Sequence, residues 1–264
     1  MVVLIMDKID IYNYAYWGKN YNQIIQELAN MALPEQWSFG DKNDYFILKN
    51  YMKYTFFKLQ EDNSIFKSDQ YYIFNTGLFN KYYNSIYVRC IEDSTQESGK
   101  KFVDFCTEYE LLHSMIMDLP PRANYFNHAS DLVFDWHYDI IVNYEHILED
   151  EENKKRLPAE ITNAEKQERE LQGAIDESIK RVMANYKLAV PQYFGSKIQL
   201  LLPLYFGKEN KPLLALVLTK ITNSSGKTKY LGHTCLTMDM AYNNARLIAK
   251  PESNWLLPQN IDSH

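Results

Sequence analysis

Two nearly continuous apolar runs constrain the fold of this chain most strongly. They are "KIQLLLPLYF" at 197–206 and "PLLALVLTKI" at 212–221. Runs of this kind are typical of strands that are buried on both faces of a sheet. The segment "NSSGKTK" at 223–229 then predicts a hairpin turn, and "YLGHTCLT" at 230–237 predicts a third strand.

A long amphipathic helix is predicted before these strands, from about Asn163 to Val190. Its apolar residues recur every three or four positions and form one stripe. They are Leu171, Ile175, Ile179, Val182 and Tyr186. Asn163 is a candidate N-cap, and Pro191 would end the helix.

The first half of the chain predicts helices at 19–33 and 44–60, followed by strands at 70–79, 84–92 and 100–109. Residues 131–149 favour a strand that turns into a helix, and the charged run at 150–158 favours an exposed loop. This order predicts the α+β class, with a mixed or antiparallel sheet, N-terminal helices and one long amphipathic helix packed on the sheet. A boundary near residue 155 is conceivable, but neither half has an obvious separate core. We therefore expect one domain over residues 1–264.

Charge and composition exclude some classes of protein. The net charge of −6 disfavours broad binding to duplex DNA, although a local basic pocket for a single strand or a nucleotide stays open. Tyrosine is common, at 21 residues, and could stack on bases or simply fill the core and surface. No apolar stretch is long enough to span a membrane. The three cysteines form neither a paired framework nor a metal-binding pattern, so we expect a cytoplasmic protein.

The stretch "GHTCLTMDMAYNNAR" at 232–246 concentrates polar side chains at a predicted junction between strand and helix. On a strand, His233, Cys235 and Thr237 would share one face. On the following helix, Asp239, Asn243 and Arg246 would share one side. The first amides of that helix could bind phosphate beside His233 and Thr237. The alternative is a buried histidine, a capping threonine and a surface Asp–Arg pair.

Two further clusters are candidates for ligand binding. Asn75 and Thr76 precede Gly77, and they could form a cradle for a base or phosphate or only a tight turn. Near the end of the long helix are four more candidates, whose cations could instead stabilise the helix dipole. These are Arg181, Tyr186, Lys187 and Gln192.

Several familiar motifs are absent from the sequence. "TNSSGKT" at 222–228 resembles a phosphate-binding P-loop, but Ile221 stands where that motif needs glycine, and a strand follows. His137 and His146 show no metal-ligand spacing. We therefore expect no metal and no cofactor.

Five segments carry a resemblance to a known family. They are "LPEQWSF…ILKNYMKYTF", "IFNTGLF", "HILEDEENKKRLP", "NYKLAVPQYF…IQLLLPL" and "GHTCLTMDMAYNNARLI". In this order they resemble a bacterial domain-of-unknown-function family, number 3825, which is also described as the OST-HTH-associated domain. The resemblance spans roughly residues 20–257. Members are often joined to cold-shock or OST-HTH modules that bind RNA, which implies a role with RNA.

The leading expectation is therefore an RNA- or nucleotide-binding domain that recognises phosphate and base at the strand-to-helix junction. One alternative is a metal-independent phosphodiesterase or nuclease acting on RNA or cyclic nucleotides. In that case His233 would transfer protons, Asp239 would orient it or a water, and His146 would be the other candidate group. A second alternative is an accessory protein that binds another protein in defence or phage biology.

Overall fold

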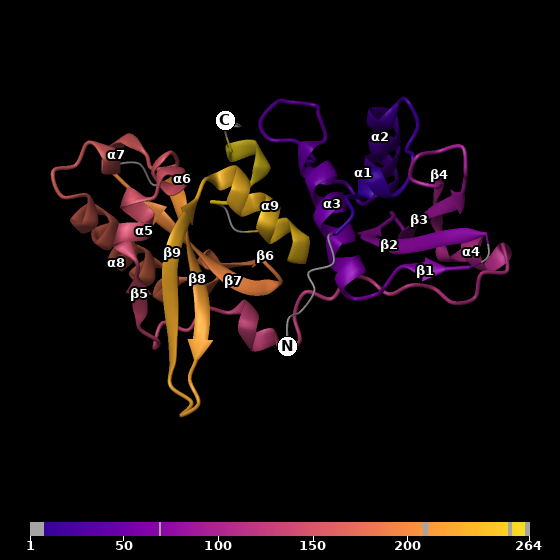
Figure 1. Cartoon of the computed structure of the whole chain (residues 1–264). Helices are drawn as coiled ribbons and strands as arrows, with labels where there is room; N and C mark the ends of the chain where they lie inside the picture. Colours follow the sequence, from indigo (N-terminus) through magenta and orange to yellow (C-terminus); the bar gives the residue numbers. More distant parts are fainter. Residues whose placement is uncertain (1–7, 69, 208–210, 253–254, 262–264) are drawn as a thin grey trace. The chain divides into compact units, whose positions relative to one another are not determined.

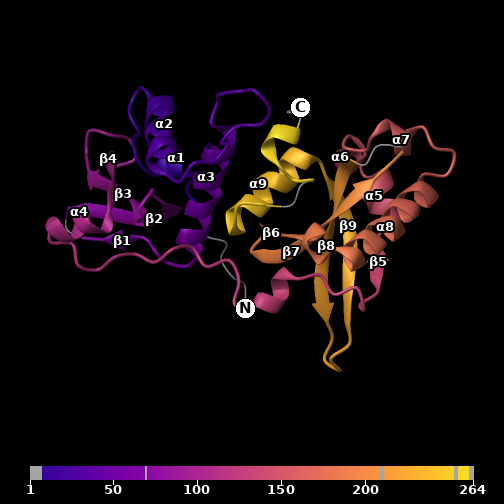
Figure 2. The ribbon, with the colours of Figure 1, turned by 180° about the vertical axis from the view of Figure 1, so that it is seen from behind.

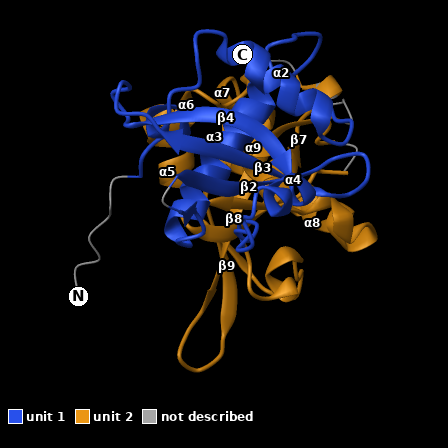
Figure 3. Ribbon diagram, turned by 90° about the vertical axis from the view of Figure 1, so that its right-hand side faces the viewer, with its two compact units in different colours: residues 1–124 blue, residues 125–264 orange. Residues whose placement is uncertain are grey.

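The computed structural model describes residues 8–68, 70–207, 211–252 and 255–261. The chain forms two compact units, Met1–Asn124 and Tyr125–His264 (Figure 3). Each unit combines helices with a sheet, so the chain has the α+β class that the sequence predicts. No helix in these described ranges is long and apolar enough to cross a membrane.

In its described residues, 8–68 and 70–124, unit 1 contains an antiparallel sheet in the order β1-β2-β3-β4 together with four helices. Its elements are α1 (Ile11–Tyr14), α2 (Tyr21–Met31), α3 (Phe46–Glu61), β1 (Phe66–Lys67), β2 (Tyr71–Phe79), β3 (Ser85–Glu92), β4 (Lys100–Thr107) and α4 (Glu108–His113). The predicted helices at 19–33 and 44–60 and the three predicted strands are all present.

Helical periodicity explains how these helices pack. In α2 the buried side chains are Ile25 and Leu28, three positions apart, which puts them on one side of the helix. Helix α4 begins with a capping box, in which Thr107 and Glu110 satisfy each other's backbone amides. Leu111 of α4 is fully buried against the sheet, beside Ile73 and Tyr87.

Unit 2 contains a sheet in the order β5-β9-β8-β7-β6, which is antiparallel except for the parallel pair β5–β9. The strands are β5 (Ile140–Val142), β6 (Val190–Phe194), β7 (Lys197–Tyr205), β8 (Pro212–Thr222) and β9 (Thr228–Leu236). The helices are α5 (Tyr144–Glu149), α6 (Glu151–Lys154), α7 (Ala159–Thr162), α8 (Gln167–Ala184) and α9 (Met238–Ile248), with short 3-10 turns η1 (Ala129–Leu132), η2 (Tyr186–Leu188) and η3 (Pro258–Asn260).

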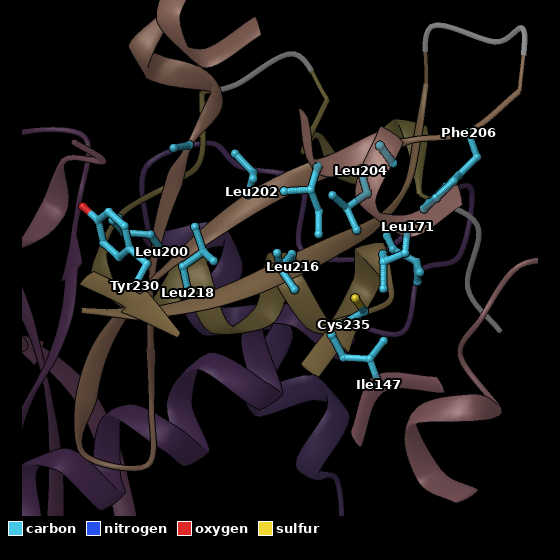
Figure 4. Packing of buried hydrophobic residues seen from close by; sticks show 14 of the residues in the cluster. Ile147, Leu171, Leu200, Leu202, Leu204, Phe206, Leu216, Leu218, Tyr230 and Cys235 are labelled. Carbon is cyan, nitrogen blue, oxygen red and sulfur yellow. The ribbon is translucent and has the colours of Figure 1, made fainter. Parts of the chain in front are cut away.

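Both faces of the central strands in unit 2 are covered, as their apolar sequences require. On one face, Leu200, Leu216 and Cys235 meet Ile147 of α5 and Leu171 of α8 (Figure 4). Helix α9 packs on β6 and β8 from the other side of the sheet (Figures 1 and 2). The sheet is therefore a buried middle layer between two sets of helices.

The predicted long helix is shorter than its sequence pattern. Helix α8 runs from Gln167 to Ala184, because Asn163 ends the preceding short helix α7 as its C-cap. Pro191 does not end the helix but lies in the edge strand β6, where a missing N–H is tolerated.

Of two further predicted segments, the loop at 150–158 is corrected in part and the turn after β8 is confirmed. The charged run at 150–158 contains the short helix α6, whose N-cap Asp150 accepts two backbone N–H bonds. The hairpin turn at 223–227 is confirmed: Gly226 has a positive φ, and the Asn223 side chain accepts the amides of Ser225 and Lys227.

Candidate functional site

At the junction between β9 and α9, the side chains of Thr237 and Asp239 bind each other. Thr237 occupies the N-cap position, and its carbonyl accepts the amide of Ala241. Its hydroxyl does not cap the helix but donates to Asp239 Oδ1 at 2.5 Å. Thr237 and Asp239 thus engage each other, a contact that the sequence pattern does not predict.

His233 sits at a β-bulge. Val217 pairs with Thr234 and Leu218 pairs with Gly232, which leaves His233 as the extra residue of β9. The bulge shifts the alternation, so Cys235 lies in the core whereas His233 stays partly exposed. The predicted common face of His233 and Cys235 is therefore not formed. In the described part of the chain, no hydrogen bond reaches the His233 ring.

Asn243 and Arg246 lie on the packed side of α9 and not on its surface. Each is 8% exposed. Asn243 Oδ1 has no hydrogen-bond partner among the described residues. Because Arg246 is buried, the alternative of an Asp–Arg pair on the surface of α9 is wrong.

Asn75 and Thr76 lie inside β2, at a bulge opposite β3. Asn75 is 3% exposed and Thr76 is fully buried. Asn75 Oδ1 accepts the Gly77 amide at 2.8 Å, and the Thr76 hydroxyl donates to Ile86 O at 2.7 Å. These groups stabilise the bulge, and in this conformation they present no polar atom to a ligand.

The residues predicted near the end of the long helix lie in separate places. Arg181 forms an ion pair with Glu177 at 2.6 Å, and its guanidinium lies 4.0 Å from the centre of the Tyr205 ring. Burial raises the pKa of Tyr205, and the positive charge of Arg181 opposes that rise. Arg181 is therefore bound to its own helix and to β7.

Tyr186 and Lys187 line a cavity of about 460 Å³ at the C-terminal end of α9, which we call the helix cavity. Ala245, Ile248 and Lys250 line it as well. Because α9 has 11 residues, this cavity lies about 16 Å along the helix from Thr237. The N-terminus of α9 therefore lies at one end of this helix, and Lys187 lies beside the other end.

Gln192 belongs to a chain of side-chain hydrogen bonds that leads from α9 to a second cavity. Asn244 Nδ2 donates to Gln192 Oε1 (3.1 Å), Gln192 Nε2 donates to Gln199 Oε1 (3.0 Å), and Gln199 Nε2 donates to Thr219 Oγ1 (2.9 Å). We call this chain the amide relay. Gln192 is fully buried and Gln199 is 8% exposed. Thr219 already accepts a bond, so its own hydroxyl proton is available for another acceptor.

The relay ends at a cavity of about 480 Å³, which we call the hairpin cavity. Aromatic, amide, hydroxyl and charged side chains line it together. These are Tyr125, Phe126, Asn127, His128, Asp131, Lys197, Gln199, Thr219, Lys220 and Thr222. It contrasts with the helix cavity, whose lining is largely aliphatic.

Local structure fixes several of these side chains. The tight turn Gly195–Ser196 has two positive φ angles, as a two-residue hairpin turn requires, and it places Lys197 at the start of β7. The Tyr125 ring packs edge-on against Tyr193, with 4.8 Å between ring centres. Lys220 lies 3.8 Å from Asp131.

The charge in this region is strongly positive. Between Ser178 and Lys250 the sequence has two acidic residues, Glu209 and Asp239, and eleven lysines and arginines. Segregation of charge along a sequence predicts a polyanion-binding region even in a chain whose total charge is negative. The total charge of −6 conceals this local excess of cations.

No group of histidine, cysteine or carboxylate side chains within the described ranges could hold a metal ion. No curated protein and no solved structure matches the chain. A family model does match, over residues 28–255, and covers both units. Its description is a domain of unknown function, DUF3825, and the chain belongs to this family.

Proposed function

We propose that unit 2 binds RNA or a nucleotide at the hairpin cavity and has no catalytic activity of its own. The observation that carries the proposal is the composition of that cavity, where aromatic rings, amides and lysines meet in the basic part of the chain. A volume of about 480 Å³ is within the range of small-molecule sites.

Each group has a role that follows from its chemistry. A base would stack on Phe126, which is partly exposed. The neighbouring Tyr125 ring is fixed by its edge-on contact with Tyr193. Asn127 and the Thr219 hydroxyl would hydrogen-bond the base or ribose. Lys197 and Lys220 would neutralise a phosphate.

This proposal places the ligand at the Thr219 end of the amide relay and not at the strand-to-helix junction. At the junction, Thr237 and Asp239 engage each other, whereas the hairpin cavity collects cations from β7 and β8. The resemblance to the OST-HTH-associated domain, which implies a role with RNA, adds support. We also propose a cytoplasmic location, where the three buried thiols would stay reduced.

Fluorescence anisotropy with random-sequence single-stranded RNA of 12 nucleotides tests the proposal. We expect Phe126→Ala to weaken binding by about 1–3 kcal/mol, the range for loss of one stacked base. Lys197→Ala should weaken binding and reduce its dependence on salt. Lys155→Ala, on the exposed end of α6, is the matched control and should bind as the wild type does.

Equal binding by wild type, Phe126→Ala and Lys197→Ala would rule out the hairpin cavity. Incubation of the wild type and His233→Ala with the same RNA separates binding from turnover. Cleavage that is lost in His233→Ala would replace the proposal with the enzyme alternative.

A further inference from the structure

The strands β8 and β9 continue past the rest of their sheet as a two-stranded ribbon (Figures 1 and 2). The pairing of β7 with β8 ends at Leu218, whereas β8 and β9 stay paired up to Thr222 and Thr228. Residues 220–227 are exposed along both edges and the turn. We call residues 219–231 the ribbon.

The ribbon is cationic along its length. It carries Lys220, Lys227 and Lys229 and contains no aspartate or glutamate. Lys220 faces Asp131 at 3.8 Å and Lys229 forms an ion pair with Asp139 at 3.0 Å. Lys227 is exposed at the turn, where Asn223 fixes the backbone by accepting its amide.

The ribbon begins in the hairpin cavity and leads away from it. Thr219, Lys220 and Thr222 line the cavity, and Lys227 lies at the level of Asn223, which is four residues beyond Thr219 and directly follows the end of β8. At about 3.3 Å per residue, Lys227 is about 13 Å from Thr219. Thr222 is the outermost of the lining residues, so the level of Lys227 lies one residue, about 3.3 Å, beyond the lining of the cavity. A chain that leaves the cavity along the ribbon therefore meets Lys227 next.

We infer that the ligand is a single-stranded RNA chain and not a free nucleotide, with one nucleotide in the hairpin cavity and its neighbours along the ribbon. The inference rests on the proposed function of that cavity. At a stacked spacing of about 3.4 Å, the distance to Lys227 corresponds to about four nucleotides. Three lysines on a ribbon that has no acidic residue of its own suit a repeating phosphate backbone, because contact with phosphate depends on charge and not on base identity. Lys220 and Lys229 would exchange Asp131 and Asp139 for phosphate.

Length dependence of binding tests the inference. The probes are an equimolar mixture of the four ribonucleoside 5′-monophosphates, measured by equilibrium dialysis, and random-sequence RNAs of 2 and 12 nucleotides. We expect the 12-mer to bind at least tenfold more tightly than the dinucleotide. In Lys227→Ala/Lys229→Ala, the association constant for the 12-mer should fall roughly tenfold at 0.15 M salt. The slope of the logarithm of that constant against log salt is negative, and it should become less steep by about 1.4.

The matched control is Lys154→Ala/Lys155→Ala on α6, which removes the same charge and likewise includes one ion-paired lysine. It should retain the wild-type slope. Circular dichroism melting checks that both double variants are folded.

The possible results separate the two proposals. Equal affinity for mononucleotides and the 12-mer, with no effect of the ribbon variant, would overturn the RNA-chain inference and leave the cavity function standing. Equal losses in the ribbon and control variants would also overturn it. Failure of the wild type to bind any probe would sink the cavity function and the inference together.

Discussion

Gly77 is the residue whose backbone most clearly limits what can replace it. Its φ is +78°, and a Cβ built there would lie 2.4 Å from the Tyr51 hydroxyl oxygen, whose side chain is buried. Gly18 has a similar φ of +83° but open space around the same position. Comparing substitutions at Gly18 and Gly77 therefore separates the cost of backbone strain from the cost of steric overlap.

We expect Gly18→Ala to cost about 1–2 kcal/mol, the usual strain of a left-handed alanine. Gly77→Ala should cost about 1–3 kcal/mol more, because Tyr51 must move within a packed core. Urea unfolding measures both values. In a Tyr51→Phe background the penalty of Gly77→Ala should shrink, and an unchanged penalty would mean that the hydroxyl is not the obstacle.

The three cysteines make stability depend on pH in the alkaline range. Burial raises the pKa of Cys90, Cys106 and Cys235 from about 9 to about 12. Above pH 9 the unfolded chain releases these protons while the folded chain keeps them, so the free energy of unfolding falls as pH rises. A shift of this size contributes about 1.4 kcal/mol per thiol between pH 8 and pH 10.

The three thiols should therefore lower the free energy of unfolding of the wild type by about 4 kcal/mol between pH 8 and pH 10. Tyrosines whose pKa is raised by burial, such as Tyr205 and Tyr230, add to the loss that urea unfolding measures. Cys235→Ala should be less stable at pH 8, because it leaves a small cavity, yet lose about 1.4 kcal/mol less on going to pH 10. A loss in Cys235→Ala as large as that of the wild type would show that the Cys235 thiol already ionises in the folded protein.

The amide relay joins α9 to the sheet through a fully buried glutamine. Gln192→Leu would leave Gln199 Oε1 without its donor, so we expect a loss of about 1–3 kcal/mol in the free energy of unfolding. Gln172→Leu, at an exposed position of α8, should change stability by less than about 0.5 kcal/mol. In Gln192→Leu/Gln199→Leu the two losses should be less than additive, because the second change removes the orphaned acceptor. Additive losses would mean that the two amides act independently.

Sequence patterns predicted the elements whose burial has a clear period. The apolar runs of β7 and β8 and the stripe of α8 are examples, because burial on one or both faces imposes the pattern directly. Strand β6 was missed, since its five residues include Pro191, which also fits the end of a helix. Helix α6 was missed because its four residues are nearly all charged.

The candidate site depends on features that spacing along the chain does not encode. The bulge at His233 adds one residue to β9, and alternation alone cannot foresee it. The hairpin cavity collects Phe126, Lys197 and Lys220 from segments more than 20 residues apart. The sequence predicts Gln192 as a ligand-binding residue, but its place in a buried relay appears only once β6, β7 and α9 are packed.

The whole chain is acidic, yet one segment of it, residues 178–250, is strongly basic. The calculated isoelectric point is about 5.6, whereas 178–250 carries eleven basic and two acidic residues. At physiological salt, exposed charges interact over about 8 Å, so a polyanion responds to the local patch and not to the total charge. Binding to a polyanion that has no nucleobases therefore measures the electrostatic contribution to the proposed binding alone.

We expect the protein to be retained on a heparin column at pH 7.5 and low salt, despite its net charge of −6. Lys197→Glu/Lys220→Glu should elute at clearly lower salt, because both changes fall in the hairpin cavity. Lys154→Glu/Lys155→Glu alters the net charge by the same amount on α6 and should elute with the wild type. If both variants shift equally, retention depends on net charge alone, and residues 178–250 offer no localised surface for a phosphate chain.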